Sequence, residues 1–288
     1  MQYTNKFNLP EPVVRFLMKD TYSRGSSEYS ATEIMASPKI KRMQEQYDHL
    51  MVRDVSDMFA SRMGTVMHHM LEKMIVEGYI NEERLFTTMD DVVISGAIDL
   101  QHDTGEGLKV VDFKSTKAWQ LMQSKREWEQ QLNIYKWLVE TVKRKKVIRL
   151  QVMAWVKDWS KFDAREGYPE GHAVMVEVPL WDSVRTEMYI RERLNMHRDA
   201  KVAHDFGEEL QPCTKEERWE KETIYAVKRE GRKTAIRIFK TIEEATELAE
   251  KEKGYVDTRA GESTRCIANY CGVNEWCEQF KGIQNAAK

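Results

Sequence analysis

Residues 96–116, GAIDLQHDTGEGLKVVDFKST, constrain the fold of this chain more than any other stretch. The segment predicts a β-hairpin turning at Gly105-Glu106, because glycine is preferred at the first central position of a type II′ turn. In that register Asp99 lies directly opposite Asp112. Side chains that face each other across an antiparallel pair have Cβ atoms about 4.5–5.5 Å apart. The hairpin therefore predicts two neighbouring carboxylates inside an apolar run.

Lys114 adds a positive charge to this pair of acids. It follows Asp112 by two residues, so both side chains project from the same face of the strand. Buried charge is costly without a partner, and neighbouring carboxylates repel unless a cation lies between them. Either the three groups pair with one another, or the hairpin holds a cation.

The segments around the hairpin alternate between helix and strand patterns. A capping box, Ser30 with Glu33, predicts a helix start, and methionines at helical spacing predict an amphipathic helix near residue 67 with its methionine stripe in the core. After the hairpin the patterns predict a helix over 124–145, strands within 146–159 and 171–181, and a helix over 182–203. This order indicates an α/β fold, with a central mixed β-sheet flanked by helices.

The character of the chain changes near residue 205. We predict a first domain over residues 1–204, with a helical N-terminal region, and a small cysteine-rich subdomain over 205–288. The second part contains a hairpin turning near Glu230-Gly231, a helix, and a tail. It also holds all four cysteines of the chain: Cys213, Cys266, Cys271 and Cys277. Because disulfides are rare in cytosolic proteins, this cluster indicates a metal or iron–sulfur centre, with buried inert thiols as the alternative.

Composition sets broad limits on function. Charged residues make up 32% of the 288, and the net charge of -2 neither indicates nor excludes nucleic acid. The run KRKK at 143–146 is either a local basic stripe or a solvated helix end. With no long uncharged apolar run and no signal-peptide pattern, we expect an intracellular protein that does not cross a membrane.

Two carboxylates and a lysine on one strand face suit metal-dependent hydrolysis of a phosphodiester. Oxygen ligands favour Mg²⁺ or Mn²⁺, and such an ion polarises the phosphoryl oxygen and activates water. A nearby lysine stabilises developing negative charge or orients the attacking water. Taken alone, however, the spacing of Asp112 and Lys114 is more typical of a surface ion pair.

Four landmarks occur in order between residues 64 and 135: GTVMHHMLE, GAID, DFK and QLNIY. Together they resemble the histidine motif, G-x-x-D, acid-x-lysine and Q-x-x-x-Y of RecB-like nucleases in the PD-(D/E)XK superfamily. The surroundings, YSATEI with SPKIKR and EWEQQLNIY, are similar to phage-encoded members.

The resemblance assigns a role to each matching residue. It implies that a metal ion is bound by His68, Asp99, Asp112 and the carbonyl of Phe113. Lys114 would be the catalytic lysine. Gln131 and Tyr135 would line the site and either touch the DNA backbone or support the strand. From the residues alone, His69 is as capable of ligation as His68; only the distance from Gly64 favours His68.

The tail RCIANYCGVNEWCEQF resembles the C-terminal cysteine segment of iron–sulfur exonucleases, including CRISPR-associated ones. The resemblance implies a structural [4Fe-4S] cluster, with Zn²⁺ as the alternative, because thiolates bind both. The sequence departs from that pattern in two ways: Cys213 does not lie upstream of the histidine motif, and the spacing from Cys266 to Cys271 is wider.

The resulting hypothesis is a Mg²⁺- or Mn²⁺-dependent deoxyribonuclease, an exonuclease acting at DNA ends. If phage-encoded, it would serve recombination or replication in the host cytoplasm. The alternatives are a non-catalytic nucleic-acid-binding protein on a nuclease fold with a structural metal cluster, and an assembly factor that docks through the KRKK and RERLNMHRDAK helices. Protein partners and oligomeric state are not predicted.

Overall fold

The structure is a computed structural model that describes residues 1–19, 23–122 and 126–286. The chain forms two compact units, one of residues 1–36 and 52–201 and the other of residues 37–51 and 202–288. The predicted division at residue 204 assigns residues 37–51 to the first domain, whereas they pack in the second unit. Hydrophobic packing explains this placement, because Ile40 and Met43 are buried in the cluster that contains the cysteines.

The first unit is built on a six-stranded mixed sheet with the order β2-β5-β6-β7-β8, in which β4 also pairs with β5. The β2–β5 and β6–β7 pairs are parallel and the others antiparallel, so the predicted α/β fold with a mixed sheet is confirmed. The strands are β2 (Tyr29–Ser30), β4 (Tyr79–Met89), β5 (Val92–Asp103), β6 (Leu108–Thr116), β7 (Val147–Val156) and β8 (Ala173–Val178).

The register of the β5–β6 hairpin agrees with the prediction up to the site. Pairing runs from Asp103↔Leu108 to Leu100↔Val111, and Gly105 has the positive φ of +82° that the predicted turn requires. The ladder ends there, so Asp99 and Asp112 are not a paired position, which corrects the expected direct opposition.

The two strands separate at this point because β5 changes partners along one edge. Ser95 of β5 pairs with Ser30 of β2, and Leu100 pairs with β6. Along this edge, residues 96–99 of β5 therefore lie after the pairing with β2 ends and before the pairing with β6 begins. The opening in the sheet falls at Asp99.

The strand β4 was not predicted. It pairs with the other edge of β5 from Tyr79↔His102 to Met89↔Val92. Its register skips Glu82, whose φ is +50°, a left-handed conformation that is uncommon outside glycine. The register is the same on both sides of the interruption, so Glu82 lies level with Asp99 on the neighbouring strand.

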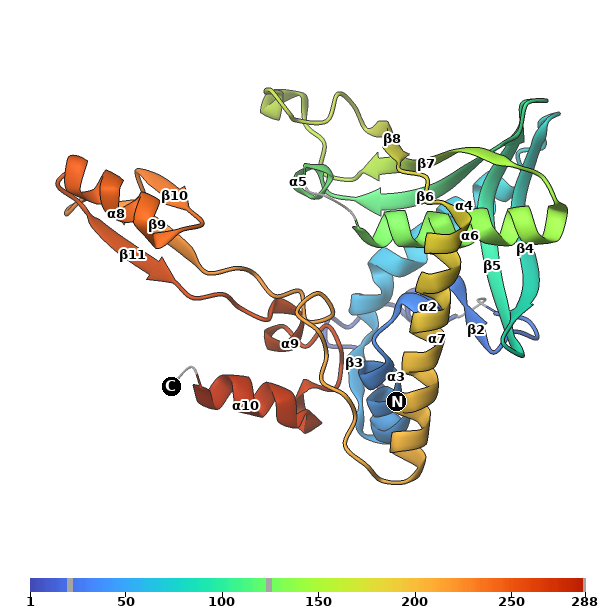
Figure 1. Cartoon of the computed structure of the whole chain (residues 1–288), viewed down its shortest axis with the longest axis horizontal. Helices are drawn as coiled ribbons and strands as arrows, with labels where there is room; N and C mark the ends of the chain where they lie inside the picture. The colour runs from blue at the N-terminus through green and yellow to red at the C-terminus, as the bar shows by residue number, and fades with distance from the viewer. Residues whose placement is uncertain (20–22, 123–125, 287–288) are drawn as a thin grey trace. The chain divides into compact units, whose positions relative to one another are not determined.

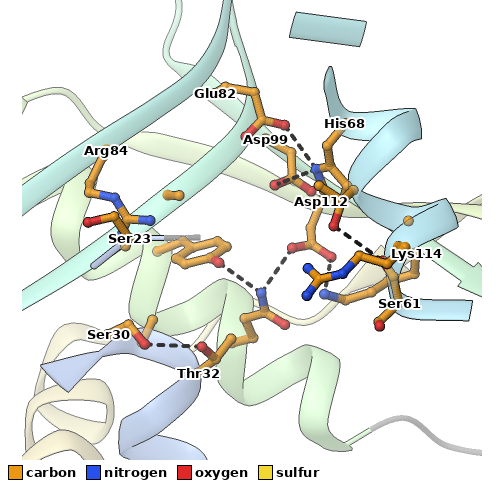
Figure 2. Close-up of a pocket in the computed structure, with 18 residues that line it drawn as sticks. Ser23, Ser30, Thr32, Ser61, His68, Glu82, Arg84, Asp99, Asp112 and Lys114 are labelled. Atoms are coloured by element: carbon orange, nitrogen blue, oxygen red, sulfur yellow. Dashed lines mark hydrogen bonds and ion pairs between the residues drawn. The ribbon is translucent and has the colours of Figure 1, made fainter. Parts of the chain in front are cut away.

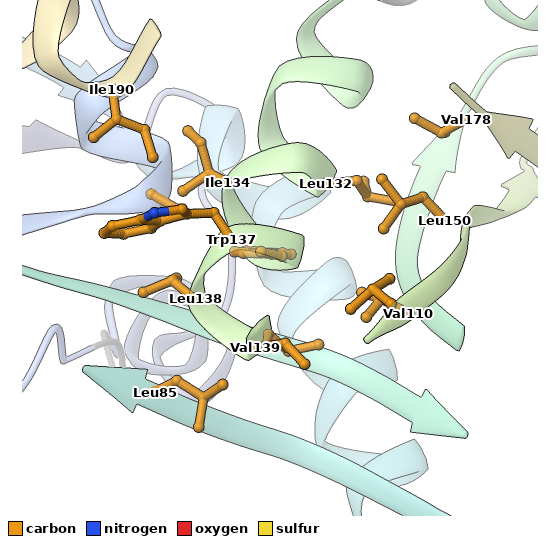
Figure 3. Close-up of a cluster of buried hydrophobic side chains, with 14 of the residues drawn as sticks. Leu85, Val110, Leu132, Ile134, Trp137, Leu138, Val139, Leu150, Val178 and Ile190 are labelled. Atoms are coloured by element: carbon orange, nitrogen blue, oxygen red, sulfur yellow. The ribbon is translucent and has the colours of Figure 1, made fainter. Parts of the chain in front are cut away.

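Helix α6 (Arg126–Lys143) crosses the sheet and supplies much of its core (Figure 1). It corresponds to the predicted helix over 124–145, whose first two residues lie outside the described part of the chain. Leu132 and Leu138 are fully buried, and Figure 3 shows α6 side chains directed at the strands. The long helix α7 (Ser183–Asp205) also confirms a predicted helix and adds Ile190 and Leu194 to this core.

Shorter elements complete the first unit. They are α1 (Glu11–Met18), α2 (Ala31–Met35), α4 (Phe59–Glu72), α5 (Ala118–Leu121) and the parallel pair of β1 (Gln2–Thr4) with β3 (Val52–Asp54). The predicted capping box is present at α2, where Ser30 Oγ accepts from the Glu33 amide at 3.3 Å and Glu33 Oε2 accepts from the Ser30 amide at 2.9 Å. In the described residues, no helix combines the length and apolar character that a bilayer crossing requires.

The methionine stripe of α4 is not part of the core. Met70 is 64% exposed, Met74 just beyond the helix is 58% exposed, and no residue of α4 is buried. The prediction of a core stripe was therefore wrong. A helical spacing of apolar residues identifies one face of a helix, but it does not decide whether another element covers that face.

The second unit contains a three-stranded antiparallel sheet of β10 (Arg237–Phe239), β9 (Ile224–Lys228) and β11 (Tyr255–Arg259), in that order. Helix α8 (Ile242–Lys251) packs on the sheet through Ala245 and Ala249, which contact the buried Val227. The predicted hairpin and helix are thus present. The unit also includes α3 (Pro38–Tyr47), α9 (Thr264–Ile267) and α10 (Glu278–Ala286).

We expect Gly96→Ala to lower the free energy of unfolding by about 1–3 kcal/mol, the usual cost of overpacking. An added Cβ would lie 2.5 Å from Leu138 Cδ1 and 3.0 Å from the Tyr135 ring, so α6 could no longer approach β5 as closely. Chemical denaturation measures the effect. Gly64→Ala is the control: its Cβ would meet nothing within 4 Å, and alanine in a helix should stabilise by up to about 1 kcal/mol. Equal effects of the two substitutions would contradict the close approach.

Candidate active site

A pocket of about 530 Å³ in the first unit collects most residues that the sequence singled out (Figure 2). Its lining includes His68, Asp99, Asp112, Lys114, Gln131 and Tyr135. They come from α4, β5, β6 and α6, which are far apart in the chain. The pocket therefore exists only where the opening in the sheet meets two helices.

Asp112 lies at the centre of the polar contacts. It is 1% exposed, and Lys114 Nζ approaches its Oδ2 at 2.8 Å. Gln131 Nε2 donates to its Oδ1 at 3.0 Å. The alternation of side chains along β6 sends Asp112 and Lys114 to the same face, as predicted. Both carboxylate oxygens of Asp112 are thus held by cationic or amide groups.

Asp99 is buried beside this group, and only 6% of it is exposed. Its Oδ2 accepts from the Phe113 amide at 2.6 Å, which bridges the gap between β5 and β6. Burial, with a further contribution from the negative charge of Asp112, raises the pKa of Asp99 to about 8. A buried carboxyl beside a second acid, with its pKa raised in this way, is a common feature of functional sites.

His68 faces the acids, whereas His69 does not. His68 Nδ1 lies 2.9 Å from Glu82 Oε1 and 3.5 Å from Asp99 Oδ1. The hydrogen bond to Glu82 raises the pKa of His68 above its ordinary value, helped by the charge of Asp99 and opposed by burial. The side chain of His69 is 65% exposed and lies 3.4 Å from Glu72. Of the two histidines left open by the sequence, His68 is the one in the pocket.

Glu82 is the member of the site that the sequence analysis missed. One ligand atom from each of His68, Glu82 and Asp99 lies within 4.8 Å of the other two. The sequence does contain an acid at this point, but the strand carries two consecutive acids. The pattern alone does not show which of the two belongs to the site. Glu83 forms a structural contact, with its Oε2 2.6 Å from Lys143 Nζ, whereas Glu82 has a left-handed backbone and lines the pocket.

Gln131 and Tyr135 line the pocket, but both side chains are largely buried and hydrogen-bonded to each other. Gln131 is 6% exposed and Tyr135 5%, and the Gln131 amide donates to Tyr135 Oη at 2.8 Å as well as to Asp112. Of the two roles considered from the sequence, this geometry favours support of the Asp112 carboxylate over direct contact with DNA.

The donor set fits a divalent ion. His68, Glu82 and Asp99 offer one imidazole nitrogen and two carboxylate oxygens close together, and Asp112 lines the same pocket. Carboxylate-rich sets favour Mg²⁺ or Mn²⁺. The amide of Phe113 binds Asp99, and ligation by its carbonyl remains a prediction.

The four cysteines converge in the second unit. Cys213, Cys271 and Cys277 are buried, Cys266 is half-buried, and all four are free thiols within one cluster. Ser37 Oγ lies 3.4 Å from Cys213 Sγ. Burial, and then the charges of the other three thiols, raise the pKa of Cys266 to about 11. The arrangement is therefore poor for free thiolates, and a bound metal would supply the missing positive charge.

Comparison with known proteins identifies the class. The model of the PD-(D/E)XK nuclease superfamily matches residues 74–278, and the chain belongs to this superfamily. The match includes Glu82, Asp99, Asp112 and Lys114 and begins after His68. Members of the superfamily are typically metal-dependent nucleases.

Solved structures of low identity are also similar. The protein SSO0001 is 15% identical, with a TM-score of 0.43, and the similarity covers 64% of this chain and 82% of that one. A candidate exonuclease of Eubacterium rectale is 11% identical, with a TM-score of 0.29, and 66% and 71% are covered. No curated protein matches the sequence.

We expect Asp99→Asn to stabilise the metal-free protein at pH 8 by about 1–3 kcal/mol. The pKa of Asp99 is about 8 when folded and about 3.9 when unfolded, so the wild type loses stability as pH rises between these values. Asparagine does not titrate, and the difference between variant and wild type should therefore grow from pH 4 to pH 8.

Urea denaturation in EDTA across this pH range measures the difference. Asp103→Asn is the matched control, because Lys145 lowers the pKa of the exposed Asp103, and this substitution should not stabilise. A pH-independent effect of Asp99→Asn would show that Asp99 is not held at a raised pKa.

Proposed function

We propose that the protein is a Mg²⁺- or Mn²⁺-dependent deoxyribonuclease whose active site is the pocket around Asp112. The observation that carries the proposal is the convergence of His68, Glu82 and Asp99 within 4.8 Å, beside Asp112 and Lys114. Membership of the nuclease superfamily supports it.

His68, Glu82, Asp99 and Asp112 would hold the ion, which when bound supplies a Lewis acid for the phosphoryl oxygen and a more acidic water. The residues of the chain provide position and charge. Gln131 fixes the Asp112 carboxylate from α6, and the Phe113 amide fixes Asp99. Lys114, whose side chain is 28% exposed, lines the pocket with its ammonium 2.8 Å from Asp112 Oδ2, and there it would stabilise negative charge developing on the phosphate.

Cleavage from DNA ends is the finer part of the proposal. It rests on the resemblance of the motifs to RecB-like nucleases, as does a role of a phage-encoded enzyme in recombination or replication within the host cytoplasm. A linear duplex and a covalently closed circle of the same sequence separate exonuclease from endonuclease action, since only the first offers ends.

We expect Lys114→Ala to lower the cleavage rate of linear DNA by about 10²–10³-fold, the usual cost of removing one electrostatic stabiliser. Glu82→Gln should instead raise the metal concentration needed for half-maximal rate, because it removes a ligand rather than the ammonium. The measurement is release of nucleotides against Mg²⁺ or Mn²⁺ concentration, with EDTA abolishing all activity.

Lys6→Ala serves as the control, because this lysine of the same unit is exposed and lies outside the pocket lining. Full activity of Lys114→Ala would remove the mechanism. Tight DNA binding with no cleavage by the wild type would favour the alternative, a non-catalytic nucleic-acid-binding protein on a nuclease fold.

For the second unit, we propose a structural [4Fe-4S] cluster held by Cys213, Cys266, Cys271 and Cys277. The resemblance of the tail to iron–sulfur exonucleases favours it, and the convergence of four free thiols in one apolar cluster is compatible with it. The cluster would fasten the tail to Cys213 and to α3, whose Gln44 already donates to the Cys271 carbonyl at 2.8 Å.

The coordinating groups alone leave the choice between iron–sulfur and zinc open, because thiolates bind both. The cavity lined by the four cysteines measures about 20 Å³.

We expect the protein purified without oxygen to be brown, with about four iron and four sulfide per chain. Cys277→Ser should lose the colour and lower the unfolding temperature, because the tail is no longer fastened. Metal analysis that finds one zinc and no iron would select the alternative centre.

A further inference from the structure

One aromatic side chain of the first unit is held entirely in solvent. Phe162, in the β7–β8 connection, is 101% exposed, more than any other large apolar residue of the described chain. Binding residues are often carried by connections that a rigid scaffold positions, so an exposed aromatic ring on an ordered connection is a candidate contact for a ligand.

The connection that carries Phe162 is well fastened. Phe162 lies in a short 3₁₀ turn, where Ser160 Oγ accepts from its amide at 3.2 Å. Tyr168 Oη accepts from the Ser160 amide at 3.0 Å, and Trp159 Nε1 donates to the Pro169 carbonyl at 2.8 Å. These bonds close the base of the loop and leave the ring outside it.

A second exposed aromatic residue lies on the neighbouring segment. Trp119, 53% exposed, belongs to α5, which directly follows β6. The Ala118 amide donates to Asp158 Oδ1 at 2.7 Å, and the Lys157 amide donates to the Thr116 carbonyl at 2.9 Å. The two segments are therefore joined at their bases, at the end of the strand that carries Lys114 (Figure 1).

The charges around the two rings indicate the occupant. Lys117, Lys157 and Lys161 are exposed beside them, and acids on the same loop, Asp163 and Glu166, keep its net charge low. Two flat rings with a few flanking cations suit unpaired nucleotides, whose bases stack on aromatic faces while lysines approach the phosphates. The bases of an intact duplex are not available for such stacking.

We propose that Trp119 and Phe162 form a stacking platform for single-stranded DNA beyond the end of β6, the strand that carries Lys114. The inference rests on the proposed function and specifies its substrate: a strand with unpaired bases that contacts the protein beyond the end of β6. Because stacking dominates over charge here, the platform should add little to the salt dependence of binding.

The test is the affinity of the full chain, carrying Lys114→Ala to prevent cutting, for a short fluorescein-labelled oligothymidylate measured by anisotropy. Phe162→Ala should weaken binding by about 5- to 150-fold, and Phe162→Trp should restore it. Phe7→Ala is the matched control, because Phe7 is a 70% exposed aromatic residue of the same unit in the connection after β1. An abasic oligonucleotide of equal length should bind equally well whether or not the chain carries Phe162→Ala.

Unchanged oligothymidylate affinity of Phe162→Ala would overturn the platform, as would an equal loss on the abasic strand. Self-association that depends on Phe162, with DNA affinity intact, would identify the surface as a protein contact instead. The two proposals fail separately. If the protein with Lys114 intact cuts no DNA but binds oligothymidylate through Phe162, only the nuclease proposal is refuted. If cleavage does not depend on Phe162 and Trp119, only the platform proposal is refuted.

Discussion

Two aspartates that share one buried pocket are the constraint around which the first unit is arranged. Asp99 and Asp112 are both less than a tenth exposed, and like charges at such proximity in a poorly solvated space destabilise each other. The chain surrounds them with groups that reduce the repulsion: Lys114 and the Gln131 amide on one side, His68 and the Phe113 amide on the other. The pKa of Asp99 is raised even so, first because the carboxyl is buried and then because of the charge of Asp112.

The scaffold keeps this arrangement open by leaving the sheet incomplete. Between Ser95 and Leu100, β5 changes from one neighbouring strand to another, and Asp99 lies in the interval. On the other edge, the left-handed Glu82 interrupts the β4 ladder and turns a third carboxylate toward His68. Since ladder hydrogen bonds otherwise fill a sheet, interruptions on both edges at one level are what make room for a metal site.

The second unit follows a different principle. Its three-stranded sheet has only a small apolar cluster with α8, and its cysteine cluster includes four unbonded thiols among apolar side chains. A unit of this size gains much from a metal staple, because binding energy becomes folding energy when the ligands are far apart in the chain. Cys213 and Cys277 are separated in this way, and α3 joins them from a still more distant segment.

The sequence by itself determined the mixed α/β class, the β5–β6 turn and register, the capping box, and the set of His68, Asp99, Asp112 and Lys114 as candidates. These follow from local rules: side-chain alternation, turn preferences and motif spacing. Tertiary structure alone decided which histidine faces the acids, that Glu82 joins them, and that Gln131 supports Asp112 from within. It also decided that the methionine stripe of α4 stays outside the core. Each of those depends on which elements meet in space, and an unpaired strand position or an uncovered helix face leaves no period in the sequence.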